Sequence, residues 1–372
     1  MIAQSCKTCS ERRAGKAMGS LDQTDGSRRR PPSMQDVARH AGVSAQTVSR
    51  VANGMSNVEE LTRERVLTSM RAVGYRPNGA ARALKYGRFH TVGVIMFTLE
   101  TLGNVRTLDA IATEAAAADY SVTLMPVPDP TLGAVSGAYR RLSEQSVDGV
   151  IIIFEASLLD RVEITLPPGL PVVVIDSNAG SGYAVVDTDQ AQGARMATEH
   201  LLSLGHRQVW HIAGPTTSFS AGHRAESWRA TLQRAGITPP PIVHGDWSTE
   251  SGHRAMLKLV GERDLTAVFA ANDQMALGAM KALHELGRLI PTDVSVVGFD
   301  DMDESRAFWP PLTTVRQNFR EVGRVAMARL LAQIEAPDAA PQTTLIPTEL
   351  MVRASTGPAP TLPGRPTATP AG

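Results

Sequence analysis

The 372-residue sequence lacks any long apolar run, and this lack argues against a membrane protein. Nothing in it approaches the ~18 consecutive apolar residues of a transmembrane helix, and its N-terminal region has no apolar segment of the secretory type. We therefore expect a cytoplasmic protein without a membrane partner. A hydrophobic content of 42% with 20% charged residues is typical of globular proteins, and the length allows two or three domains.

Cysteine is nearly absent, which argues against a disulfide framework. Both cysteines, Cys6 and Cys9, lie in a polar N-terminal segment without periodicity. Two sulfurs supply half of the ligands of a structural zinc site, and the pair has no strand and helix around it for redox chemistry. We expect an untethered tail and no metal site there.

Common enzyme motifs are also missing. The first strand-like run continues as GVIMFTL, which is no G-x-G-x-x-G loop, and the sequence has no G-x-S-x-G. Asp300, Asp301, Asp303 and Glu304 lack the glycine and the spacing of a calcium loop, so they predict a solvated turn. We expect no catalytic residue, no bound metal and no cofactor.

The net charge of zero conceals an asymmetry along the chain. Residues 28–88 contain twelve basic and four acidic residues, a net charge of +8, and the other segments balance it. A basic module at one end of an acidic body is the pattern expected of a protein that binds nucleic acid with that end.

Residues 34–54, MQDVARHAGVSAQTVSRVANG, predict two short helices joined at Gly42. Ser33 and Asp36 have the spacing of a capping box, and Ser44 is placed to cap the second helix. Asn53 and Gly54 tolerate the left-handed conformation that ends helices. The stretch therefore reads as a helix-turn-helix.

The second of these helices has one apolar and one polar face. Val48, Val51 and Ala52 share the apolar face, whereas the opposite face carries Gln46, Ser49, Arg50 and Asn53. Gln pairs with adenine and Arg with guanine in a major groove. A merely solvated helix face is the alternative interpretation.

The rest of the chain predicts a third small helix and then an α/β body. Residues 59–73 have helical periodicity, and the Ala-rich residues 79–85 are too few for a stable isolated helix. From residue 91, apolar runs alternate with helical stretches such as 224–235, as in parallel sheets covered on both faces. We expect two doubly wound halves with a ligand cleft at the carboxyl ends of their strands.

The sequence resembles the lactose-repressor family of bacterial transcription regulators over residues 33–356. The resemblance is carried by SMQDVARHAGVSAQTVSRVANG, TRERV, GYRPNGAARAL, EHLLSLGHRQVWHIAGP, ANDQMALGAMKAL, DVSVVGFDD and PPLTTVRQNF. It implies an N-terminal all-α helix-turn-helix domain with a hinge helix, followed by an α/β periplasmic-binding-protein-like effector domain of two doubly wound parallel-sheet halves. No catalysis is required of such a protein.

The resemblance implies a homodimer that binds double-stranded palindromic operator DNA, with the second helix of each protomer in the major groove. Leu84 matches the hinge leucine that wedges between base pairs, although a buried linker leucine is the alternative. The implied DNA-binding residues are Ser44, Ala45, Gln46, Thr47, Arg50, Asn53, Asn78, Ala81 and Leu84.

The resemblance also implies a small carbohydrate effector such as a galactoside. The matching positions are Asp176, Arg224, Trp247, Asn272, Asp300, Gln317 and Phe319. Carboxylate, amide and guanidinium groups suit hydroxyls, and aromatic rings suit the apolar face of a pyranose. Each position could instead be structural, because Asp300 could cap a turn, Arg224 could pair with Glu226, and Trp247 could lie in the core.

Three features depart from the family pattern. Ser227 stands where the family has a glycine, and MFTLETLGNV, residues 96–105, matches poorly, so half of the pocket stays unassigned. C-terminal leucine heptads are missing, so tetramers held by a coiled coil are not expected.

We expect a disordered tail at 1–32, a helix-turn-helix domain at 33–78, a hinge helix and linker at 79–90, a two-lobed effector-binding and dimerisation domain at 91–356, and a disordered tail at 357–372. The expected function is a sequence-specific DNA-binding regulator, a repressor, that is controlled by a carbohydrate. The chain could instead be a sugar-binding protein without a role in transcription, or a regulator that answers a nucleobase or a phosphorylated metabolite.

Overall fold

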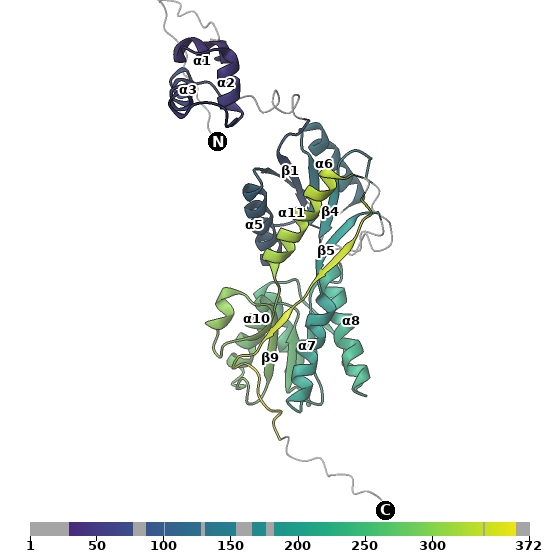
Figure 1. The fold of residues 1–372 in the computed structure, drawn as a ribbon. Helices are drawn as coiled ribbons and strands as arrows, with labels where there is room; N and C mark the ends of the chain where they lie inside the picture. The colour runs from purple at the N-terminus through teal and green to yellow at the C-terminus, as the bar shows by residue number, and fades with distance from the viewer. Residues whose placement is uncertain are drawn as a thin grey trace, which may run out of the picture. The chain divides into compact units, whose positions relative to one another are not determined.

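The computed structural model describes residues 30–76, 87–99, 101–127, 131–153, 166–175, 182–337 and 339–361. The chain divides into two compact units, Met1–Asn78 and Gly79–Gly372 (Figure 1). The predicted hinge at residues 79–85 and most of both predicted tails lie outside the described residues.

The first unit is a three-helix domain, as the sequence predicts. Its helices are α1 (Met34–Ala41), α2 (Ala45–Ala52) and α3 (Glu60–Val73). Ser33 and Asp36 form the predicted capping box, and Gly42 ends α1 in the left-handed conformation, with φ 65°. The core consists of small apolar side chains from all three helices, Val37, Ala38, Ala41, Val48, Val51, Val66 and Met70.

The second unit consists of two lobes, each built on a six-stranded sheet. The first sheet has the order β11-β5-β4-β3-β1-β2 and is parallel. Its strands are β1 (Thr91–Met96), β2 (Ser121–Pro126), β3 (Gly149–Ile153), β4 (Val172–Ile175), β5 (Ala184–Thr188) and β11 (Thr343–Ile346). Its helices are α5 (Leu102–Ala117), α6 (Leu132–Glu144) and α11 (Phe319–Glu335).

The second sheet has the order β12-β10-β9-β8-β6-β7, and only its β10–β12 pair is antiparallel among the described pairs. Its strands are β6 (Trp210–Ala213), β7 (Val243–His244), β8 (Ala267–Ala270), β9 (Ser295–Asp300), β10 (Thr313–Arg316) and β12 (Glu349–Met351). Its helices are α7 (Gln190–Ser203), α8 (Phe219–Arg234), α9 (Thr249–Leu259), α10 (Asp273–Glu285) and the 3₁₀ helix η2 (Asp303–Arg306).

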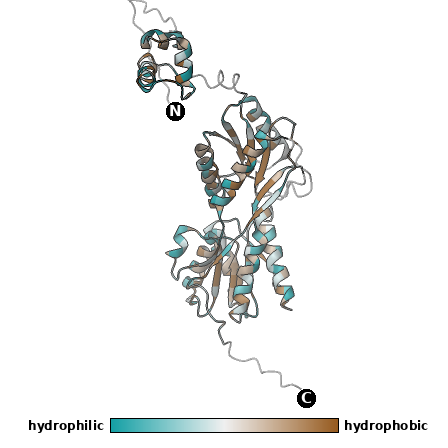
Figure 2. Ribbon diagram, in the orientation of Figure 1, coloured by the Kyte–Doolittle hydropathy of each residue, from teal (hydrophilic) through white to brown (hydrophobic). Residues whose placement is uncertain are grey.

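The central strands of both sheets are buried on both faces, which explains their continuous apolar runs. In β3, Val150 and Ile152 contact the α6 side, whereas Ile151 and Ile153 contact the side covered by α5 and α11. Figure 2 shows the strands mainly in brown, whereas the helices mix brown and teal. The chain crosses between the lobes three times, from β5 to α7, from β10 to α11 and from β11 to β12.

Two helices begin earlier than their apolar periodicity indicates. The helix predicted at 224–235 is α8, and it starts at Phe219, where Ser218 accepts a hydrogen bond from the backbone N–H of Ala221. The apolar periodicity predicts another helix centred on residues 109–119; this helix is α5, and it starts at Leu102, within the segment that matched the family poorly. These first turns are rich in small or polar residues, so periodicity alone could not locate them.

The acidic turn after β9 is not fully solvated, which corrects the sequence prediction. Asp300 and Asp301 are only 8% and 6% exposed. Asp301 accepts a hydrogen bond from Arg316 Nε at 2.8 Å and another from Arg353, so two guanidinium groups compensate for its burial. Only the end of the cluster is at the surface, where Asp303 is exposed.

The predicted start of the C-terminal tail, residue 357, is too early in the sequence. The backbone N–H of Gly357 donates to Ser295 Oγ at 3.1 Å, and that of Ala359 donates to the Leu204 carbonyl at 2.9 Å. Backbone hydrogen bonds hold this segment against the second lobe. Amino-acid composition does not indicate such bonds, so the predicted boundary is wrong by at least three residues.

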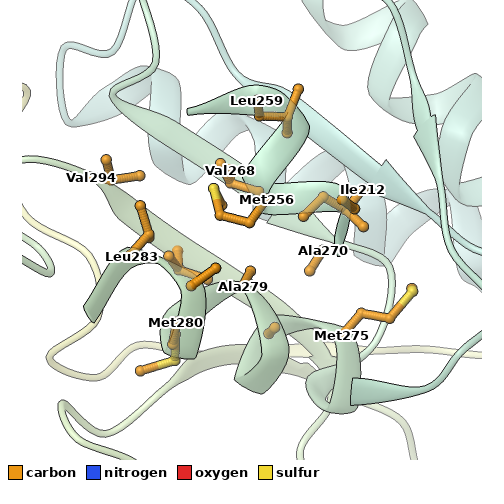
Figure 3. Packing of buried hydrophobic residues seen from close by; sticks show 14 of the residues in the cluster. Ile212, Met256, Leu259, Val268, Ala270, Met275, Ala279, Met280, Leu283 and Val294 are labelled. Carbon is orange, nitrogen blue, oxygen red and sulfur yellow. The ribbon is translucent and has the colours of Figure 1, made fainter. Parts of the chain in front are cut away.

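The second lobe contains a close helix pair, α9 against α10. Met256 and Leu259 of α9 belong to one buried apolar cluster with Ala279 and Leu283 of α10 (Figure 3). A Cβ on Gly278 would overlap the Thr249 carbonyl and would lie 2.7 Å from the backbone nitrogen of His253. The glycine thus permits contact between the two helix backbones.

We therefore expect Gly278→Ala to destabilise the second unit by about 1–3 kcal/mol, because the backbone of α9 must move to admit one methyl group. Gly222→Ala in α8 is the matched control, since its Cβ would meet nothing within 4 Å. The control should be neutral or stabilising by up to about 1 kcal/mol through helix propensity. Urea unfolding of the full chain measures both, and equal midpoints would contradict the packing argument.

Candidate functional site

The helix α2 presents a polar face to solvent. Val48 and Val51 are buried in the core of the first unit, whereas Gln46 and Arg50, one helical turn apart, are exposed. The first residue of the helix, Ala45, is also exposed. This arrangement gives the predicted reading face an amide and a guanidinium that can reach another molecule.

Other predicted contact residues fix the ends of α2. Ser44 Oγ accepts from the Thr47 backbone N–H at 3.1 Å and lies 2.9 Å from Thr47 Oγ1. Asn53 Nδ2 donates to the Ser49 carbonyl at 2.6 Å. These bonds hold the helix on which Gln46 lies. Three further predicted contacts lie outside the described residues, namely Asn78, Ala81 and Leu84.

A pocket of about 620 Å³, counting the space open to solvent, lies between the lobes of the second unit. Its described lining comprises Thr101, Leu102, Gly103, Asn104, Thr107, Ile153, Ile175, Asp187, Thr188, Gln190, Ser220, Arg224, Trp247, Asn272, Gln274, Asp300, Gln317, Phe319 and Val322. Six of the seven predicted effector residues are in this set, and Asp176 lies outside the described residues.

Four lining side chains form a closed ring of polar contacts. Arg224 Nε donates to Gln190 Oε1 at 2.8 Å, and Gln190 Nε2 donates to Gln317 Oε1 at 3.3 Å. Gln317 Nε2 donates to Asp300 Oδ1 at 2.6 Å, and the same oxygen lies 3.9 Å from Arg224 Nη1. The ring includes residues from both the β5–α7 and the β10–α11 crossovers.

Arg224 is 4% exposed, and its guanidinium group lies close to two aromatic rings. Its guanidinium carbon is 3.8 Å from the ring centroid of Phe299 and 5.6 Å from that of Trp247. It also donates to the Ala271 carbonyl. The surface partner considered for it, Glu226, pairs instead with Arg229, at 2.6 Å. Arg224 thus belongs to the pocket and not to a surface ion pair.

Asn272 and Phe319 both begin helices at the pocket. Asn272 Oδ1 caps α10 by accepting from the Met275 backbone N–H at 2.8 Å, and its Nδ2 donates to the Trp247 carbonyl at 3.0 Å. Phe319 opens α11, and its ring would lie 3.3 Å from a Cβ built on Gly103. Asn272 therefore also has the structural role of ordering the second lobe around the pocket.

The pocket carboxyl groups have raised pKa values. Burial raises the pKa of Asp300 to about 6, although Arg224 and the Gln317 amide oppose the shift. Burial also raises the pKa of Asp187 to about 7, against the Thr188 N–H and Arg224. Behind them, burial and the charge of Asp300 raise the pKa of Asp273 to about 7. Hydrogen-bond donors from a ligand would favour the charged forms of the two lining carboxylates.

Sequence reasoning missed several lining residues. Thr101–Asn104 come from the segment that it left unassigned, and Thr188, Gln190 and Ser220 went unnoticed. Asp187 directly follows the apolar run of a predicted strand. Ligands bind at the carboxyl ends of parallel strands, so a polar residue at such an end is the signal that could have identified it.

Both units of the chain match families of known proteins. Residues 33–78 match the family described as bacterial regulatory proteins, lacI family, and residues 198–356 match the periplasmic binding protein-like domain. The chain is 36% identical to the lactose operon repressor of Escherichia coli (strain K12) over 329 residues, 88% of this chain and 91% of that protein. The chain belongs to the lacI family of bacterial regulatory proteins.

Other relatives have the same character. This lacI-family chain is 32% identical over 310 residues to the HTH-type transcriptional repressor PurR of Haemophilus influenzae (strain PittEE), 82% of this chain and 92% of that protein. It is therefore a DNA-binding transcriptional repressor of this type with an effector-binding domain. None of the described helices has both the length and the apolar character needed to cross a bilayer.

Solved structures of the family share the fold. The lac repressor dimer bound to operator and the anti-inducer ONPF superposes with a TM-score of 0.80 at 35% identity, covering 88% of this chain and all of that one. The transcriptional regulator CelR–cellobiose complex gives 0.65 at 30% identity, covering 87% and 99%. The predicted fold class is thereby confirmed.

We expect Arg50→Ala to weaken binding to a preferred duplex, selected from a random pool, by about 1–3 kcal/mol while binding to random duplexes changes little. The reason is that an exposed guanidinium on α2 can discriminate bases, whereas a phosphate contact cannot. Arg71→Ala is the control, since it removes an equal exposed charge from α3. Fluorescence anisotropy measures both affinities, and equal losses on both duplexes would show that Arg50 contacts only phosphate.

Proposed function

We propose that this lacI-family repressor binds a palindromic operator as a homodimer and is released when a small carbohydrate fills the pocket between its lobes. The observation that supports the effector-binding part of the proposal is the polar ring of Arg224, Gln190, Gln317 and Asp300 beside aromatic side chains. The exposed polar face of α2 supports the DNA-binding part of the proposal.

Two-fold DNA recognition requires two copies of α2, because one helix reads one half-site. The lac repressor, a relative, is a dimer in its operator complex. In this chain the loop between η2 and β10 exposes Trp309, of which 94% is accessible. Aromatic side chains are enriched where protein partners meet, so we propose Trp309 as one contact of the homodimer.

The pocket chemistry favours a neutral polyol. Carboxylate oxygens accept from hydroxyls, amides both donate and accept, and the rings of Trp247 and Phe319 suit the apolar face of a pyranose. A phosphorylated metabolite fits less well. Arg224 is the single cation of the described lining, and Asp187 and Asp300 would repel a phosphate.

A nucleobase is the second candidate effector, because the amide and carboxyl groups of the ring can also pair with the polar edge of a base. A sugar-binding protein without a role in transcription would not need the basic helix-turn-helix unit. The proposal requires no reaction, so we assign no catalytic residue. Because the proposed operator is chromosomal DNA, we propose that the protein is cytoplasmic.

Release requires that the effector bind two arrangements of the protein unequally. Gln190 and Gln317 lie on two crossovers between the lobes, so a ligand held by the ring acts on both connecting segments. A coupling of about 1–3 kcal/mol would change operator affinity roughly 5- to 150-fold, and the operator would weaken effector binding by the same factor.

We expect Asp300→Asn to bind the operator nearly as wild type does and to lose the effector response, because a hydroxyl-binding acceptor is replaced by an amide. Galactosides, glucosides and nucleobases titrated against a labelled operator complex provide the measurement. Asp264→Asn is the control, since that carboxylate is exposed and lies outside the pocket lining. A full response of Asp300→Asn to the compound that releases the wild type would place the effector elsewhere.

A further inference from the structure

Asp187 is an acidic pocket residue to which the proposed function assigns no contact. It lies near the end of β5, directly before the chain crosses to the second lobe, and it is 6% exposed. Its backbone is fixed by pairing of β5 with β11, where Leu345 is its partner in register. The carboxyl group is therefore presented to the pocket by a sheet and not by a mobile loop.

The carboxyl group of Asp187 has few protein partners for a buried acid. The Thr188 backbone N–H donates to its Oδ1 at 2.6 Å, and the Gln190 amide also favours its charged form. Among the described residues, Asp187 forms no ion pair with a Lys or Arg, and the charge of Arg224 in the same pocket favours its charged form. A carboxylate can accept about four hydrogen bonds, so acceptor sites remain for a ligand.

We propose that Asp187 determines effector specificity by accepting hydrogen bonds from hydroxyl groups of the effector, on the side of the pocket formed by the first lobe. The inference rests on the proposed function and adds a residue and a required ligand group to it. Asp300 and Arg224 are charged pocket residues of the second lobe, whereas Asp187 is the charged contact that the first lobe makes with the ligand.

The electrostatics of the free pocket agree with this role. Arg224 on α8 favours the charged form of Asp187, whereas the nearby Asp189 opposes it, and Asp300 lines the same pocket. Burial dominates and raises the pKa of Asp187 to about 7. Hydroxyl donors stabilise the carboxylate, so binding them below pH 7 first requires loss of a proton.

The sign of the pH effect follows from this raised pKa. Effector affinity should rise as the pH increases from 6 to 8 and should level off above 8, with a total change of about tenfold from a single group of this kind. In Asp187→Asn most of this dependence should vanish, leaving the smaller contribution of Asp300. A purely structural role of Asp187 would not give a pH profile of this kind.

The test uses the full chain bound to a labelled operator and titrates methyl galactoside, methyl glucoside, their monodeoxy analogues and hypoxanthine at pH 6, 7 and 8. For the sugar that releases the wild type, Asp187→Asn should raise the half-maximal concentration at least about tenfold at pH 8. One deoxy analogue should be weakened for the wild type but not further weakened for Asp187→Asn. Asp189→Asn is the matched control for the affinity at pH 8, where Asp187 is already charged, because asparagine also caps helices and Asp189 does not line the pocket.

The outcomes separate this inference from the proposed function. A sugar response that Asp187→Asn and Asp187→Ser both retain at wild-type concentrations overturns the inference alone. Release by hypoxanthine only overturns the carbohydrate effector, and it overturns this inference as well, because the base lacks the sugar hydroxyl groups that Asp187 is proposed to bind. Failure of every compound to release the wild type overturns both. Circular dichroism and operator affinity of the variants show that they are folded.

Discussion

The ring of polar contacts around Arg224 is the constraint on which the effector unit depends. A buried charge without partners costs several kcal/mol. Arg224 and Asp300 are tolerated in the interior because each faces the other and each also meets a glutamine. Those glutamines, Gln190 and Gln317, belong to segments that cross between the lobes. The ion pair is therefore fully satisfied only when both crossovers are in place.

The parts of the fold that local physics determines were predictable from the sequence. Capping residues and a left-handed glycine specify the helix-turn-helix within about twenty residues, and the structure has these caps. Sheets buried on both faces require continuous apolar strands, so the two α/β halves could be predicted from apolar runs in the sequence. The starts of α5 and α8 were not visible, because their first turns face the pocket and carry few large apolar residues.

Burial of acidic residues was the main feature that the sequence could not reveal. Asp301 is buried because Arg353, fifty-two positions later, donates to it. Asp187 is buried because a strand end meets the crossover, which is a property of topology. Such partners are distant along the chain, so a buried acidic turn and a solvated acidic turn have similar local sequences. The family resemblance located six pocket residues because it carries this tertiary information.

A pocket with incompletely satisfied acids also explains how an effector could act as a switch. In the proposed complex, the carboxyl group of Asp187 on the first lobe accepts from the same ligand that Arg224 and Asp300 of the second lobe contact. The binding free energy is then greatest in the one arrangement of lobes that brings both sets of groups to the ligand. An effector that gains its affinity in this way necessarily prefers one arrangement over the other. That unequal preference is the thermodynamic requirement for transmitting occupancy of the pocket to the DNA-binding unit.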